Sequence, residues 1–274
     1  MASGQDVAWI RAALNDMLWL LPVPFLLFLA SRYGSTLSDR AFLATVLGTA
    51  VLMTAGSWLR AIVRRRIFLS GALRGESPWY RWLRGGAGLA LVSLLAAVPL
   101  AAILLVAVIR STGSLLLIGF VVNVPALVLL RLFWERRLAA HAVPRFRPVL
   151  ALRLALAANF LLLFVGLALA ATFQSYPDFG ALTLTEAMLS EAGRQQAASA
   201  LLLGLMQLAA AKDALTWWLG QQMLPGVMQP GLQFAAWTVL LATNALVVWS
   251  YLMLCSAVMT LVHWRTWHPG KGRS

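Results

Sequence analysis

The sequence contains few charged residues. Asp, Glu, Lys and Arg together make up 11% of its 274 positions, whereas about a quarter of the residues in ordinary globular domains are charged. Hydrophobic residues make up 61% of the chain, and its mean hydropathy is +0.80. This composition excludes a soluble enzyme and a disordered chain. It predicts an all-α integral membrane protein whose residues 1–274 form one polytopic domain.

Cysteine and histidine are also scarce. Cys255 is the single cysteine, so the chain cannot form an internal disulfide or a CxxC redox pair. The three histidines, His141, His263 and His268, lack the spacing of a metal or haem site. No glycine-rich phosphate loop follows a strand pattern. We therefore expect no cofactor and no ATP site within the chain itself.

Long apolar runs predict about six membrane-spanning helices, because one crossing needs about 20 predominantly apolar residues. The first run is short and contains Pro22 and Pro24, so we expect it to continue an interfacial helix that carries Trp9 and Asp16. The last run is longer than a perpendicular crossing needs, which predicts tilt or an extension out of the bilayer. The predicted spans are residues 17–30, 41–59, 87–109, 114–130, 154–173 and 232–262.

Basic residues divide the connections between these spans into two sets. One set holds 17 of the 22 Lys and Arg residues, and it alternates along the chain with a set that holds only Arg32, Arg40, Arg110, Arg194 and Lys212. Because cytoplasmic loops of membrane proteins carry an excess of Lys and Arg, the richer set is assigned to the cytoplasm. The pattern predicts that both termini are cytoplasmic, as in a multi-pass protein of a bacterial inner membrane.

The longest outer connection, residues 174–231, contains a segment with helical character at about 182–222. Thr183 or Thr185 is a suitable N-cap, with Glu186 in the first turn of the helix that follows. Residues 197–211 are apolar but short for a crossing, and a seventh span would place the basic C-terminal tail outside. We therefore favour an amphipathic or re-entrant helical hairpin before the last span, with a true crossing as the alternative.

The arginine-rich connections are the most distinctive candidate surface. Basic residues beside a bilayer bind anionic lipid headgroups, and the same surface could dock an acidic protein partner, such as a cytoplasmic ATPase. Nucleic acid is not expected, because these arginines fall between membrane spans. The candidate docking residues are Arg60, Arg64, Arg65, Arg66, Arg81, Arg84, Arg136, Arg137, Arg145 and Arg147.

Few polar residues interrupt the spans. Asn123, Asn159 and Asn244 are interpreted either as interhelical hydrogen-bonding groups or as the lining of a substrate path. Small residues at Ala44, Gly48 and Gly56 are expected to share one face of the second span, where another helix could pack closely. No ionisable residue falls in the middle of a predicted span, so we do not expect proton coupling through a buried carboxylate.

These features favour a non-catalytic, membrane-embedded subunit of a multi-protein transport or secretion assembly, with energy or chemistry supplied by other subunits. A purely structural membrane anchor is the first alternative. A lipid-modifying membrane enzyme is the second. Its candidate acid–base groups would be the outer acids Asp178, Glu186, Glu191 and Asp213.

Overall fold

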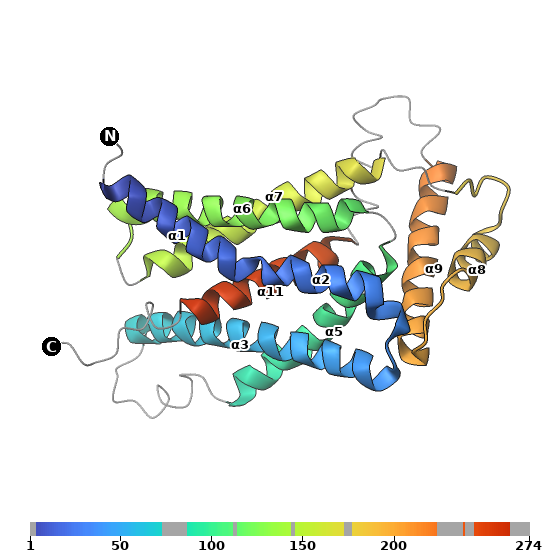
Figure 1. Ribbon diagram of the computed structural model, residues 1–274, viewed down its shortest axis with the longest axis horizontal. Helices are drawn as coiled ribbons and strands as arrows, with labels where there is room; N and C mark the ends of the chain where they lie inside the picture. The colour runs from blue at the N-terminus through green and yellow to red at the C-terminus, as the bar shows by residue number, and fades with distance from the viewer. Residues whose placement is uncertain are drawn as a thin grey trace.

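The computed structural model describes residues 4–72, 87–111, 114–143, 146–172, 177–223, 238 and 244–263, and every regular element within these ranges is a helix. Most of the helices lie along one common direction and form an elongated bundle, while α8 and α9 lie at one of its ends (Figure 1). The elements are α1 Gly4–Leu20, α2 Pro22–Tyr33, η1 Gly34–Thr36, α3 Asp39–Ala72, α5 Ala87–Arg110, α6 Ser114–Arg137, η2 Leu138–Ala140, α7 Arg147–Thr172, α8 Leu184–Gly193, α9 Ala200–Met223 and α11 Ala245–Val262.

Among the described residues, six helical stretches are long and apolar enough to cross a membrane, as the sequence predicts. Several helices continue past the predicted ends of the spans: α6 runs through Arg131 to Arg137, and α7 begins at Arg147. Most of the predicted part of the last span before Ala245 lies outside the described residues. The six stretches are Trp9–Thr36, Asp39–Ile62, Gly88–Arg110, Leu115–Ala140, Arg147–Ala170 and Ala245–Val262.

The first candidate span combines α1 and α2 and extends beyond the predicted 17–30 at both ends. Leu21 separates the two helices, and Pro22 stands in the first turn of α2, where its missing N–H costs no intrahelical hydrogen bond. The apolar stretch begins at Trp9 rather than at residue 17. Asp16 therefore lies within the first candidate span.

Helix α11 is the central element of the bundle. It packs against α1, α3, α5 and α7, and most of its side chains are buried. The ring of Tyr251 stacks on that of Phe120 in α6 with 4.0 Å between the ring centres. The Tyr251 hydroxyl donates a hydrogen bond of 2.7 Å to the Phe120 carbonyl oxygen. Cys255, one turn further along, is fully buried in the same core.

The predicted cap of the outer segment is confirmed. Thr183 is the N-cap of α8 and forms a capping box, in which its hydroxyl accepts from the Glu186 amide and the Glu186 carboxylate accepts from the Thr183 amide. This bond from the Thr183 backbone, reinforced by one from its hydroxyl, lowers the pKa of Glu186 below its ordinary value. Helix α8 packs on α9 through a small cluster of Phe179, Ala187 and Ala214.

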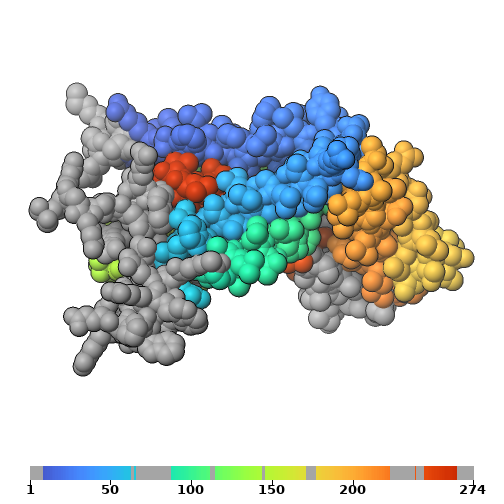
Figure 2. Space-filling model, turned by 90° about the horizontal axis from the view of Figure 1, so that it is seen from below, coloured from blue at the N-terminus to red at the C-terminus, as the bar shows by residue number. Residues whose placement is uncertain are grey.

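Helix α9 runs across the end of the bundle, crosswise to the long helices α1, α3, α6 and α7 (Figure 1). The space-filling view shows that α8 and α9 form a layer over this end (Figure 2). Although α9 has 24 residues, it is not among the six stretches that are apolar enough to span. This arrangement argues against residues 197–211 as a seventh crossing parallel to the others.

Polar contacts attach the start of α9 to the connection between α2 and α3. The Ala198 amide donates a 2.8 Å hydrogen bond to the Ser35 carbonyl oxygen. The Ser199 hydroxyl donates to the Asp39 carboxylate and accepts from the Leu202 amide at 3.1 Å. Ser199 thus caps α9 while binding the first residue of α3, so the end layer has a fixed position on the bundle.

Candidate functional site

The structure gives several of the candidate docking arginines partners within the chain. Arg60 donates to the Thr260 hydroxyl at 3.0 Å, which connects α3 to α11. The guanidinium carbon of Arg136 lies 4.7 Å from the centre of the Trp9 ring, and that of Arg137 lies 5.5 Å from the Phe133 ring. Arg147 reaches the Ala139 carbonyl oxygen at 3.4 Å. Arg65 is exposed on α3, whereas the side chains of Arg64, Arg66, Arg81, Arg84 and Arg145 lie outside the described residues.

The asparagines within the predicted spans occupy two separate places. Asn123 in α6 and Asn159 in α7 are buried and exchange two amide hydrogen bonds of 2.9 and 3.0 Å. Asn244, which precedes α11, instead accepts from the Lys212 ammonium at 3.0 Å. The first two therefore form an interhelical contact, whereas Asn244 lines the pockets described below.

The Asn123–Asn159 pair predicts a non-additive mutational response. Replacing Asn123 with leucine leaves the Asn159 amide unpaired in an apolar interior, so we expect a loss of about 1–2 kcal/mol in the free energy of unfolding. Replacing both residues with leucine removes both amides, and we expect the double variant to recover most of that loss. Reversible unfolding in mixed detergent micelles measures both effects. A double variant as unstable as the sum of the single variants would contradict the pairing.

The small residues of α3 do not share one face, contrary to the expectation. Gly56 is buried, and a methyl group built on it would lie 2.3 Å from the Ala257 Cα atom of α11. Ala44 and Gly48 are exposed, and a methyl group on Gly48 would meet nothing within 4 Å. Eight residues from Gly48 to Gly56 correspond to a rotation of about 80° at 3.6 residues per turn. Gly56 alone therefore provides the close approach between α3 and α11.

A buried charge cluster joins three helices and was missed by the sequence analysis. The Asp16 carboxylate of α1 accepts a hydrogen bond from the Arg131 guanidinium of α6 and lies 2.6 Å from the His263 Nε2 atom at the end of α11. Glu135 adds a second carboxylate, 3.4 Å from Arg131. The side chains of Asp16 and Arg131 are 2% and 8% exposed. Asp16, Arg131 and His263 all lie just beyond the ends of the predicted spans, so the prediction for the middle of the spans stands, but Asp16 and Arg131 fall within the longer stretches Trp9–Thr36 and Leu115–Ala140.

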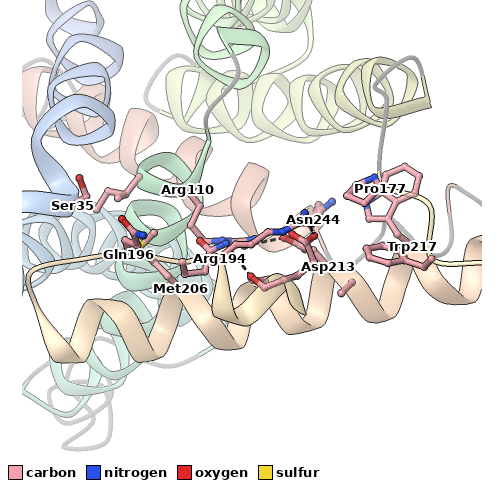
Figure 3. Close-up of a pocket in the computed structure, with 15 residues that line it drawn as sticks. Ser35, Arg110, Pro177, Arg194, Gln196, Met206, Asp213, Trp217 and Asn244 are labelled. Atoms are coloured by element: carbon pink, nitrogen blue, oxygen red, sulfur yellow. Dashed lines mark hydrogen bonds and ion pairs between the residues drawn. The ribbon is translucent and has the colours of Figure 1, made fainter. Parts of the chain in front are cut away.

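A polar pocket of about 670 Å³ lies where α9 crosses the bundle. Arg110, Arg194, Asp213 and Asn244 lie together at its centre (Figure 3). Trp217 and Pro177 line one end of the pocket, and Ser35 and Gln196 line the other (Figure 3). The last residue of α5, the loop between α8 and α9, and one face of α9 thus provide its walls.

Asp213 is the central charged group of this polar pocket. Its carboxylate forms ion pairs of 2.8 Å with Arg110 and of 2.8 Å with Lys212. Glu191 forms a separate ion pair of 2.6 Å with Arg194. Of the four outer acids considered for acid–base chemistry, these two therefore line the pocket as members of ion pairs. Glu186 caps α8, and Asp178 accepts from the Gly180 amide.

An apolar pocket of about 620 Å³ adjoins the polar one. Both are lined by Arg110, Asp213 and Asn244, so the ion pair between Arg110 and Asp213 stands at their boundary. Aliphatic side chains supply the remaining walls apart from Ser111 and Lys212. They are Ala102, Ile103, Val106 and Ala107 of α5, Leu115 and Leu116 of α6, Leu167 and Ala170 of α7, Leu205, Leu208 and Ala209 of α9, and Leu246 and Val247 of α11.

Comparison with known protein families, curated proteins and solved structures finds no match to this chain. Within the ranges described above, no three His, Cys, Asp or Glu side chains are grouped as a metal ion would require.

Proposed function

We propose that the chain is a membrane-embedded subunit of a multi-protein transport or secretion assembly in a bacterial inner membrane, and that a separate cytoplasmic partner supplies the energy. The length of α3 is the observation that carries this proposal. The helix has 34 residues, but its apolar stretch ends at Ile62. Residues 63–72 continue the same helix and include Arg64, Arg65 and Arg66.

The extension of α3 is longer than headgroup anchoring requires. Ten helical residues rise about 15 Å, whereas the headgroup region adds roughly 5–8 Å on each side of the hydrocarbon core. Arg64, Arg65 and Arg66 stand at the base of this extension, about 3–6 Å beyond Ile62, and uncharged residues 67–72 continue the helix past the headgroups. Positive charge at the base of a projecting helix suits an acidic protein surface, because electrostatic complementarity steers such encounters. The positive-inside rule places this segment in the cytoplasm, where an energy-supplying subunit would lie.

Charge reversal tests the partner surface. We expect mild detergent extraction of the tagged wild-type chain to retain a fixed set of partner proteins at constant stoichiometry. The triple variant R64E/R65E/R66E should lose at least one of them, because the reversed charges repel an acidic surface. The variant R32E/R40E is the control for position, since it reverses two charges at the other end of the bundle. Quantitative mass spectrometry of the purified material measures partner content.

Two results would overturn this proposal. The first is a wild-type chain that purifies as a lone monomer under extraction that preserves other complexes of the same membrane. The second is equal loss of partners in the triple variant and in R32E/R40E, because the α3 extension would then have no special role.

A further inference from the structure

The polar and apolar pockets together form a two-part cavity, and its two parts complement the polar and apolar ends of an amphiphile. Their volumes of about 670 and 620 Å³ both fall within the range of small-ligand sites. The apolar part follows α5 from Ala102 to Arg110, which is about 12 Å along the helix. That distance is close to the thickness of one half of the hydrocarbon core. An acyl chain is the ligand group that matches this apolar part.

Charge at the boundary between the two parts favours an anion. Arg110 and Lys212 share the single carboxylate of Asp213, so one positive charge remains uncompensated there. The Arg110 side chain is 18% exposed, and its Nε atom is buried with no hydrogen-bond partner among the described residues. A guanidinium group binds phosphate through its N–H donors, and the exposed part of the Arg110 side chain presents this group to the pocket.

Besides the Glu191–Arg194 ion pair and several apolar side chains, uncharged polar groups line the polar pocket. Gln195, Gln196 and Ser35 carry amide and hydroxyl groups that can bond to hydroxyl groups of a ligand. A headgroup that joins a phosphate to a small polyol fits this arrangement better than a bulky cationic headgroup, which Arg110 and Lys212 would repel.

We propose that this cavity binds one phosphatidylglycerol-type phospholipid, with its phosphate at Arg110 and Lys212, its glycerol headgroup in the polar pocket, and an acyl chain in the apolar pocket. The proposal goes beyond the partner-docking function and does not depend on it, because the cavity lies beside α9 and the C-terminal end of α3 lies at the other end of the bundle (Figure 1). The site can be occupied in the purified chain alone.

Native mass spectrometry of the full-length chain in detergent tests lipid binding. Phosphatidylglycerol, phosphatidylcholine and inorganic phosphate are added separately and in competition. We expect one phosphatidylglycerol molecule to bind about tenfold more tightly than phosphatidylcholine, and excess inorganic phosphate to leave it bound. Equal affinity for the two lipids would overturn the anion assignment. Displacement of the lipid by inorganic phosphate would show that the acyl chain contributes nothing to binding, and would overturn the proposal that the ligand is an amphiphile.

Three variants test the site, and they shift affinity in opposite directions. R110Q removes the phosphate ligand and should weaken phosphatidylglycerol binding about tenfold. D213N removes the competing carboxylate and should strengthen binding by a similar factor. A209W places a large side chain in the apolar pocket and should abolish acyl-chain binding. R40Q removes an arginine outside the cavity and serves as the control.

Circular dichroism and thermal unfolding of each variant establish that it is folded. If R110Q does not fold, D213N and A209W still decide the question, since unchanged affinity in both would refute the site. If the lipid-binding proposal fails, the result of the partner-retention experiment is unaffected, because that experiment examines the other end of the molecule.

Discussion

Replacing Asp16 with alanine is expected to lower the free energy of unfolding by about 3–5 kcal/mol, because the variant leaves Arg131 charged, buried and without its main partner. Asp16 is 2% exposed and contacts both Arg131 and His263, so no solvent can replace its carboxylate without opening the contact between α1, α6 and α11. Asp16→Asn should lose most of the same free energy, since it keeps the volume but removes the charge. Unfolding of the purified protein in mixed micelles measures the loss.

Two further variants show whether charge is the cause of this effect. Asp178→Ala removes an exposed carboxylate and should change stability by less than about 1 kcal/mol. The double variant D16L/R131M replaces the pair with apolar side chains and should recover much of the loss, as buried ion pairs often do when both partners are replaced. If D16A were as stable as D178A, the buried charge cluster would not contribute to the stability of the bundle.

Alanine at Gly56 is expected to destabilise the protein, whereas alanine at Gly48 should stabilise it slightly. At Gly56 the new methyl group would lie 2.3 Å from the Ala257 Cα atom and 2.5 Å from its Cβ atom, so α3 and α11 must separate. Overpacking of this kind costs about 1–3 kcal/mol or more. At Gly48 no atom lies within 4 Å, and alanine has a helix propensity about 1 kcal/mol better than that of glycine.

A compensating change tests whether the contact with Ala257 is responsible. In the G56A background, Ala257→Gly removes the opposing methyl group and should restore part of the lost stability, while the same change in the G48A background should not. Thermal unfolding of the four variants gives the comparison. Equal effects of alanine at Gly56 and Gly48 would show that the two helices do not pack closely at this point.

Hydropathy predicted the spanning helices well because it depends on each segment alone. Each of the predicted runs falls on a helix, although residues 232–244 of the last run lie almost entirely outside the described part of the chain. The α8 cap was likewise predictable, because Thr183 and Glu186 are three residues apart and bond to each other.

The features that were missed depend on contacts between distant segments. Asp16 and Arg131 are 115 residues apart. Each lies directly outside a predicted span, because a charged residue ends the apolar run from which the span is predicted. Their opposite charges make an ion pair conceivable from the sequence, but only the packing of α1 on α6 shows that the two side chains meet. The face shared by Ala44, Gly48 and Gly56 was a different kind of error, since helical periodicity alone sets Gly56 apart from the other two.

The polar pocket was predictable only in part. Arg194, Lys212 and Asp213 were recognised as charges of the outer segment, and they lie near one another in sequence. Arg110 joins them because α5 ends beside α9, and no local pattern specifies that meeting. The crosswise course of α9 likewise depends on its attachment at Ser35 and Asp39 and not on its own composition.

The burial of the only thiol in the chain has a practical consequence. Cys255 has no exposed surface in the centre of the bundle, so water-soluble maleimide reagents should leave the native protein unmodified. Single cysteines introduced at exposed positions can then be labelled without first removing the natural one. Placed at Arg65 and at Leu189, which are exposed on α3 and α8, such tags would report directly on the sidedness of each end in intact cells.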